Sequence, residues 1–150
     1  MDVSLRPAVP DDFDFLYGLN RTTMMGDVVA TWGRWDERWQ AERYRRHFQP
    51  AGCKIIVREG QDVGILVAGK TETEHYVASI RLLPEHQGRG IGTSLFNALL
   101  DEARDEGKQV TLQVLKVNDR ARRLYERLGF STVEETNTHY LMTAAPRAPS

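Results

Sequence analysis

The run from Leu82 to Leu95 joins an apolar segment to an amphipathic one through a glycine-rich turn, and it constrains the fold more than any other part of the chain. Within it, Gln87, Gly90 and Gly92 follow the spacing Gln-x-x-Gly-x-Gly. Glycines let the backbone turn tightly and come close to a ligand, while the first turn of a helix has unpaired N–H groups at its positive dipole end. The run therefore predicts a strand, a tight turn and a helix whose N-terminus can bind a phosphate group.

Two other interpretations of this turn follow from its residues. A glycine-rich connection between a strand and a helix can exist without any ligand. A dinucleotide site is the other alternative, but its pattern Gly-x-Gly-x-x-Gly requires a third glycine, and Leu95 stands at that position. The missing third glycine argues against a dinucleotide site.

Length and charge restrict the class of protein further. A chain of 150 residues can form one α/β domain with a core, and we expect this domain to cover residues 1–143, followed by a flexible C-terminal tail at 144–150. Because 20 Lys and Arg residues stand against 21 Asp and Glu residues, no overall basic field favours nucleic acid or an anionic membrane as a partner.

Cysteine content and hydropathy indicate the cellular environment. Cys53 is the only cysteine, which excludes an intrachain disulfide and a cysteine-based metal cluster, and the sequence predicts no metal site. No apolar stretch approaches the roughly 20 residues that span a bilayer, and the N-terminus lacks the apolar segment of a signal peptide. We therefore expect a cytoplasmic protein.

Apolar periodicity and turn residues predict alternating strands and helices. Strands are expected at 3–6, 53–58, 63–69, 75–83 and 110–117, with two short ones within 130–142. Helices are expected to begin at 10–12, to cover 35–48, to follow the glycine-rich turn up to Gly107, and to run from Asn118 or Asp119 to Leu128. Residues 21–34 lack a clear period and are predicted to form a loop.

The buried faces of two of these helices can be predicted from the spacing of their apolar residues. Trp35 and Trp39, one turn apart, are expected to pack against the sheet. In the helix after the turn, the predicted apolar stripe consists of Ile91, Leu95, Leu99 and Ala103.

A second block, from Asn118 to Phe130, has the spacing Asn-x-x-Ala-x-x-x-Tyr-x-x-x-Gly-Phe. Together with the glycine-rich turn it resembles the GNAT family, the Gcn5-related acyl-CoA N-acyltransferases. The resemblance is specific over residues 77–130, and the first fifty residues match in element order only. It implies an α+β fold with a mixed, mostly antiparallel sheet that splays between its strands 4 and 5 and is flanked by about four helices.

The resemblance also implies acetyl-CoA as co-substrate. The pantetheine arm would lie along the backbone of 80–83, and the pyrophosphate would lie on the N–H groups of 88–93, where Arg89 could add charge. Asn118 could contact the cofactor, cap the following helix, or both. The cofactor contacts implied in this way are Ile80, Leu82, Leu83, Gln87, Gly88, Arg89, Gly90, Ile91, Gly92, Thr93 and Asn118.

Acetyl transfer to an amine requires a general acid for the departing thiolate. By its place in the second block, Tyr125 resembles the family tyrosine that approaches the CoA sulfur, and a phenol with a pKa of about 10 can protonate a thiolate. The alternative for Tyr125 is simple ring packing with Leu124, Leu128 and Phe130.

The general base must remove a proton from an ammonium group whose pKa is near 10. Glu74 is the first candidate and His75 the second, because family members often keep a carboxylate at the start of this strand, and Glu72 lies just before it. Either candidate could also be an ordinary solvated residue. Arg81 stands where some relatives carry an acidic residue, so the base and the charge of the acceptor are not fixed by the resemblance.

For the acceptor pocket the sequence offers Trp32, Glu135 and His139, an aromatic wall and polar groups for a small-molecule or peptide amine. We expect an N-acetyltransferase that acts by direct attack of a primary amine in a ternary complex, since Cys53 lies outside both blocks and gives no support for an acyl-enzyme. The alternative is a non-catalytic CoA-binding regulatory module of the same fold. Pairing of the late strand edges could produce a homodimer.

Overall fold

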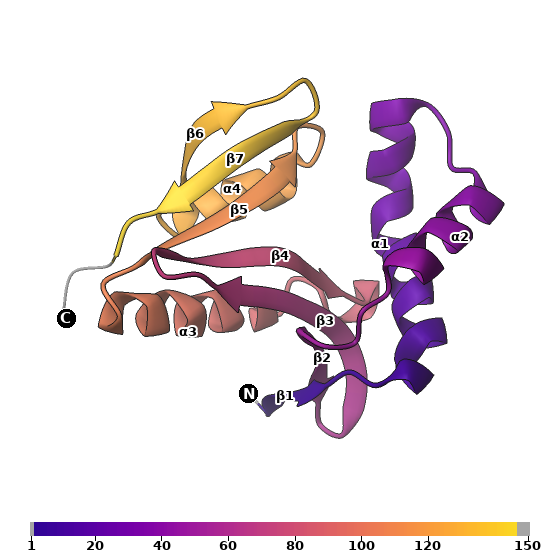
Figure 1. The fold of residues 1–150 in the computed structure, drawn as a ribbon, viewed down its shortest axis with the longest axis horizontal. Coiled ribbons are helices and arrows are strands. Elements are labelled where there is room, and N and C mark those ends of the chain that lie inside the picture. The colour runs from indigo at the N-terminus through magenta and orange to yellow at the C-terminus, as the bar shows by residue number, and fades with distance from the viewer. Residues whose placement is uncertain (1, 147–150) are drawn as a thin grey trace. The chain divides into compact units, whose positions relative to one another are not determined.

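A seven-stranded mixed sheet with the strand order β1-β2-β3-β4-β5-β7-β6 organises the chain in the computed structural model, which describes residues 2–146 (Figure 1). The strands are β1 (Val3–Pro7), β2 (Cys53–Arg58), β3 (Gln61–Lys70), β4 (Glu74–Leu82), β5 (Gln109–Leu115), β6 (Ser131–Glu135) and β7 (His139–Ala144). The helices are α1 (Phe13–Trp32), α2 (Glu37–His47), α3 (Ile91–Asp105) and α4 (Asp119–Arg127), with 3₁₀ turns η1 (Pro10–Asp12) and η2 (Pro84–His86).

The sheet combines antiparallel pairs with one parallel pair. Strands β1 and β2, β2 and β3, β5 and β7, and β6 and β7 pair antiparallel. Strands β4 and β5 pair in parallel from Glu74 opposite Gln109 to Val77 opposite Leu112, whereas β4 itself continues to Leu82. The predicted α+β fold with a mixed, mostly antiparallel sheet is confirmed.

The chain forms two compact units, neither of which is a continuous stretch of sequence. Within the described residues, the first unit contains the chain up to Val67 together with Ser79–Arg89, and the second contains Ala68–Ala78 together with the chain from Gly90 onward. The strands β3 and β4 therefore each contribute residues to both units.

The core of the first unit lies between α1 and the strands β2 and β3. Leu16 and Leu19 of α1 pack with Ile55 of β2 and Ile65 of β3, and each of these side chains is at most 7% exposed. Full burial of such a side chain contributes roughly 1.5–3 kcal/mol. The same cluster receives Tyr44 and Phe48 from α2 and the residue that follows it.

The core of the second unit lies under α3 and α4. Phe96 of α3, Tyr125 of α4 and Phe130 form a group of three rings, with centroids 5.3 Å apart for Phe96 and Tyr125, 5.9 Å for Tyr125 and Phe130, and 6.0 Å for Phe96 and Phe130. Edge-to-face rings at these separations attract one another beyond the burial of their area. Val110 of β5 and Met142 of β7, each at most 1% exposed, extend this core.

The prediction of a loop at 21–34 is wrong, because α1 continues to Trp32. Only Leu16 and Leu19 of this helix are buried, so its second half carries no apolar stripe by which the sequence could mark it. The helix ends at Gly33, which adopts the left-handed φ of 89° and donates its N–H to the carbonyl of Val29 at 2.8 Å.

The prediction that Trp39 is buried against the sheet is also wrong. Its side chain is 49% exposed and lies against the guanidinium of Arg43, 5.4 Å from the ring centre. Trp35, which precedes α2, is only half-buried. Two aromatic residues one turn apart are typical of a buried helix face, but here Trp39 is exposed to solvent and contacts the guanidinium of Arg43.

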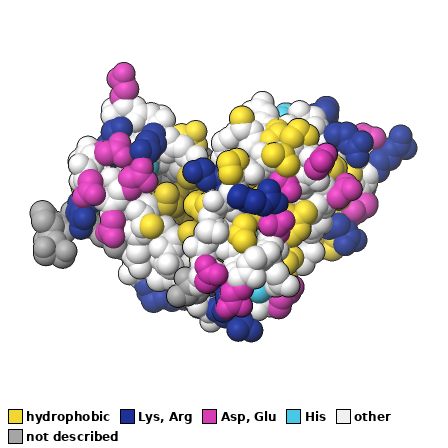
Figure 2. Space-filling model, turned by 90° about the horizontal axis from the view of Figure 1, so that it is seen from below, with side chains coloured by type: hydrophobic (Ala, Val, Ile, Leu, Met, Phe, Trp, Pro, Cys, Tyr) yellow, Lys and Arg dark blue, Asp and Glu magenta, His cyan; other side chains and the backbone are white. Residues whose placement is uncertain are grey.

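The predicted tail begins inside a strand. Ala144 belongs to β7, is 4% exposed and pairs with Val110, whereas residues 147–150 lie outside the described residues. On the face drawn in Figure 2, acidic and basic side chains are intermixed, in keeping with the nearly equal totals of 21 and 20. Within residues 2–146, no helix is both long and apolar enough to cross a membrane.

Candidate functional site

The glycine-rich turn is held in place by side chains that reach back to the backbone before it. The amide Nε2 of Gln87 donates to the carbonyl of Leu82 at 3.0 Å, and the Nε of Arg89 donates to the carbonyl of Glu85 at 3.1 Å. Gly88 and Gly90 have φ values of 72° and 82°, in the left-handed region that strains other residues. The spacing of Gln87 and Gly90 therefore has a structural cause within the turn itself. Gln87 anchors the turn by its side chain, and Gly90 adopts the left-handed conformation with which the turn ends.

The N-terminus of α3 differs from those of α2 and α4. Asp36 caps α2 by accepting from the N–H of Trp39 at 3.0 Å, and Asn118 caps α4 by accepting from the N–H of Ala121 at 3.1 Å. The N-cap of α3 is Gly90, which has no side chain, and the first turn of α3 carries no acidic residue. Within residues 2–146, the N–H groups of this turn thus have no capping side chain, and an anion is the partner that they favour.

Open space surrounds the next glycine of the motif. Apart from its own helix backbone and its chain neighbours, no atom of the described residues lies within 4 Å of a Cβ added to Gly92, so packing does not require glycine there. Gly64 of β3 is the opposite case, because an added Cβ would collide with the carbonyl of Arg81 on β4. Glycine at position 64 lets the two strands approach where β4 leads into the turn.

The segment expected to carry the pantetheine arm ends β4. Ile80, Leu82 and Leu83 are half-buried, and the N–H of Leu83 donates to the carbonyl of Val63 at 2.8 Å. Arg81, between them, donates from Nη1 to the carbonyl of Ile80 at 2.8 Å. Leu83 packs against the core of the first unit, which fixes the strand just before the turn.

Tyr125 lies in α4 with its side chain 8% exposed, and its ring packs between those of Phe96 and Phe130. Of the packing partners predicted from the sequence, Phe130 is present, and Phe96 of α3 was not anticipated. The ring is held from two sides, which orients the hydroxyl. Asn118 acts as the N-cap of α4, one of the two roles considered for it.

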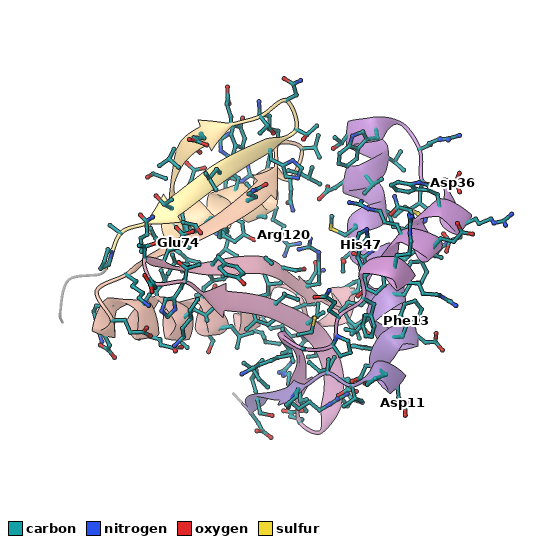
Figure 3. All side chains as sticks on the ribbon, viewed as in Figure 1. Asp11, Phe13, Asp36, His47, Glu74 and Arg120 are labelled. Carbon is teal, nitrogen blue, oxygen red and sulfur yellow. The ribbon has the colours of Figure 1, made fainter. Side chains whose placement is uncertain are left out.

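The two candidate bases on β4 have different surroundings. Glu74, labelled at the start of β4 in Figure 3, is half-buried and accepts from Nε2 of Gln109 at 3.2 Å. His75 is 3% exposed, and its Nε2 lies 3.1 Å from Oε2 of Glu106, although the angle is outside that of a well-formed hydrogen bond. His75 is therefore not the solvated residue that the sequence allowed.

Glu106, just after α3, has two lysine side chains near its carboxylate, a cluster that the sequence did not indicate. Lys70 lies 3.1 Å and Lys108 3.4 Å from its carboxylate. The close contact with Lys70, followed by those with His75 and Lys108, lowers the pKa of Glu106 to about 2. Because Lys70 ends β3 and Lys108 precedes β5, no short motif could have shown this cluster.

The three residues expected in the acceptor pocket come from both units. Trp32, at the end of α1 in the first unit, is 57% exposed. Glu135 and His139 belong to the β6–β7 hairpin of the second unit. The carboxylate of Glu135 lies 3.5 Å from Nζ of Lys116, which offsets its charge, and Nδ1 of His139 lies 2.7 Å from the hydroxyl of Thr138.

Tyr140 of β7 lies next to His139 in the same hairpin. Two cations lie over its ring, the Arg122 guanidinium 4.3 Å and the Lys116 ammonium 5.3 Å from the ring centre. Such contacts stabilise a cation over an aromatic face. The guanidinium of Arg122 is therefore engaged with Tyr140.

Comparison with known proteins confirms the resemblance to the GNAT family. Residues 20–130 match the model of the Acetyltransferase (GNAT) family. The N-alpha-acetyltransferase RimI of Mycobacterium tuberculosis is 34% identical over 116 residues, which are 73% of this chain and 72% of the relative. Two solved structures share the fold: the PaiA N-acetyltransferase from Thermoplasma acidophilum in complex with coenzyme A, and Arabidopsis thaliana Naa50 in complex with the bisubstrate analogue CoA-Ac-MVNAL.

The first of these structures aligns with a TM-score of 0.77 at 14% identity, over 97% of this chain and 99% of the other. The second aligns with a TM-score of 0.66 at 19% identity, also over 97% and 99%. Fold, turn and sequence together define an acyltransferase. The chain belongs to the Acetyltransferase (GNAT) family.

Proposed function

We propose that this chain transfers the acetyl group of acetyl-CoA to a primary amine by direct attack in a ternary complex. One observation carries the proposal: the glycine-rich turn anchored by Gln87 leads into α3, whose N-terminus has Gly90 as its cap and no acidic residue in its first turn. A diphosphate bound to the N–H groups of 88–93 would supply the negative charge that this helix end lacks.

The rest of the donor site extends from this turn. The backbone of Ile80, Leu82 and Leu83 would hold the pantetheine arm, since the N–H and C=O groups of an extended strand can pair with amides. Arg89 is held near the turn through Glu85 and would add positive charge to the diphosphate. Asn118 can contact the cofactor amide with the part of its side chain that capping does not use.

In the reaction, the amine nitrogen forms a bond to the acetyl carbonyl carbon and the carbon–sulfur bond breaks. The nitrogen loses two protons on the way from ammonium to amide: the base takes one before the attack, and the second replaces the proton that the general acid gives to the departing thiolate. Glu74 is the stronger candidate for the base, because its carboxylate is oriented by Gln109, whereas His75 faces Glu106. Tyr125, whose ring is fixed by two others, would protonate the thiolate.

For the acceptor, we propose the amine of a peptide or small molecule, with the α-amine of a peptide tested first. A relative named an N-alpha-acetyltransferase and a structural neighbour bound to a peptide bisubstrate analogue support this order. Trp32 offers an exposed indole for such an acceptor, and Glu135 and His139 offer polar groups.

The test has two stages. Acetyl-CoA is titrated into the protein by calorimetry, and thiol release is then measured with a panel of short peptides, free amino acids and polyamines. Saturable binding followed by thiol release with an amine supports the proposal. Binding without release from any member of the panel supports the alternative, a CoA-binding module. No binding to the folded protein rejects both.

A further inference from the structure

Three side chains of the first unit converge on the carboxylate of Glu37, the first residue of α2. They belong to α1 and to the connection between α1 and α2. The hydroxyl of Tyr17 donates to Oε1 at 3.1 Å, Nε of Arg21 donates to Oε1 at 3.0 Å and to Oε2 at 2.9 Å, and Nε1 of Trp35 donates to Oε2 at 2.6 Å.

These contacts require the connection to double back along α1. About 16 Å of helix separates Arg21 from Trp32, because an α-helix rises about 1.5 Å per residue. The chain from Trp32 to Glu37 can reach at most about 17 Å when fully extended. Glu37 therefore meets Arg21 only if residues 33–36 return beside the last turns of α1, and Figure 1 shows this return.

Both ends of the connection are fixed where the helices end and begin. Gly33 ends α1 in the left-handed conformation, and Asp36, labelled in Figure 3, caps the start of α2. The hydrogen bond from Arg21, and then those from Trp35 and Tyr17, lower the pKa of Glu37, so its carboxylate remains ionised at neutral pH. The three donors thus have a charged acceptor under physiological conditions.

The connection lies between two exposed tryptophans. Trp32 before it is 57% exposed and Trp39 after it is 49% exposed, while the core of the first unit is built from other residues. An exposed indole contributes little to folding, but a flat apolar ring in a fixed position is a good contact for a ligand. The hydrogen bonds to Glu37 fix the path of the connection that follows Trp32.

We propose that Glu37 is a positioning residue, which holds the α1–α2 connection so that Trp32 is presented to the amine acceptor. The inference rests on the proposed function, since it concerns the acceptor of that reaction. Glu37 touches neither the acceptor nor the acetyl group, and it acts through Trp35, Arg21 and Tyr17.

The test compares Glu37→Gln with Glu42→Gln. Glu42 lies on the same helix and pairs with Arg38, one turn away at 3.2 Å, so it is a matched control for loss of an exposed carboxylate. With an acceptor from the amine panel, Glu37→Gln is expected to raise the acceptor KM about tenfold and to leave the acetyl-CoA KM unchanged. Glu42→Gln is expected to change neither.

A second readout needs no catalysis. Arg34 lies in the connection with its side chain 82% exposed, and trypsin cleavage after it can be followed by mass spectrometry. Glu37→Gln is expected to accelerate this cleavage several-fold, because the freed connection samples conformations that a protease can bind. Tyr17→Phe removes one donor and keeps the ring contacts with Phe13 and Tyr44, so it should shift both readouts in the same direction by less.

An unchanged acceptor KM in Glu37→Gln overturns the inference and leaves the proposed function intact, since the variant still turns over. Equal increases in both KM values also overturn it, because they indicate a general structural role. A wild-type protein that binds acetyl-CoA and acetylates no amine refutes the proposed function, and the positioning role with it. A selective rise in acceptor KM together with faster cleavage after Arg34 supports the inference.

Discussion

Replacing Gly92 with Asp is expected to abolish most acetyl-CoA binding without weakening the fold. Gly92 is in the first turn of α3, and a Cβ there meets no atom within 4 Å. Asp is a better helix residue than Gly, and a carboxylate in a first turn interacts favourably with the helix dipole. We expect the free energy of unfolding to stay constant or to rise by about 0.5–1 kcal/mol.

The loss of affinity can be worked out from charge alone. If the new carboxylate lies about 6 Å from a phosphate charge, Coulomb repulsion costs roughly 1.4–2.8 kcal/mol at effective dielectric constants of about 40 to 20. This range corresponds to an increase in Kd of about 10- to 100-fold. The difference from wild type should shrink in 1 M salt, where the Debye length is about 3 Å.

The assay is calorimetric titration of acetyl-CoA into wild type, Gly92→Asp and the neutral, nearly isosteric Gly92→Asn. Thermal unfolding of the three proteins controls for folding. We expect Gly92→Asn to bind within a few-fold of wild type. Equal losses in the Asp and Asn variants would attribute the effect to steric contact, and wild-type affinity in Gly92→Asp would refute the placement of a diphosphate at this helix end.

Three further predictions concern other parts of the second unit. Tyr125→Phe keeps the ring packing, so kcat should fall about 100-fold in steady-state kinetics, with thermal unfolding as the control for folding; an unchanged kcat would exclude this general acid. Phe96→Ala removes a side chain that is 1% exposed and should cost about 3–5 kcal/mol in denaturant unfolding, whereas Thr93→Ala, on an exposed position, should cost under about 0.5 kcal/mol. Since the pKa of Glu106 is lowered from 4.5 to about 2, its ion pairs stabilise the fold above pH 4.5 and are lost as the pH falls toward 2, so Glu106→Gln should flatten the acid limb of stability against pH.

The parts of the fold that the sequence predicted well are those with local causes. The strand at 53–58 has the bounds expected from its apolar run, and the helix after Asn118 begins where a side-chain cap was expected. The strand, turn and helix around Gly90 also follow the prediction, because glycine, apolar residues and helix period all act within a few residues.

The parts that could not be predicted depend on partners distant in sequence. In α3 the expected stripe included Leu95 and Leu99, but the fully buried residues are Phe96 and Leu100 beside Ile91 and Ala103. The helix is turned by one position, because Phe96 packs with the ring of Tyr125 in α4 and with that of Phe130 beyond the helix. A period of 3.6 residues allows either stripe, and only tertiary packing selects one.

The same limit applies to the candidate site. The anchor at Gln87 and the cap at Asn118 both act over five residues or fewer. The sequence predicted the cap, whereas it pointed to Gln87 as a cofactor contact and not as an anchor of the turn. The pairing of His75 with Glu106 joins β4 to the end of α3 and leaves no pattern in the sequence. The charge around a candidate base is therefore known only once the chain is folded.

The division of the chain into two interleaved units has a consequence for its synthesis. The first unit is complete only when Ser79–Arg89 has been added, since the N–H of Leu83 bonds to Val63 and its side chain closes the core. A fragment that ends at Val67 lacks this closure, and the second unit cannot form before residues that follow Gly90 are made. On the ribosome, the core beneath the amino-terminal helices therefore stays incomplete until more than half of the chain has emerged. During this period its apolar surface is accessible to a chaperone.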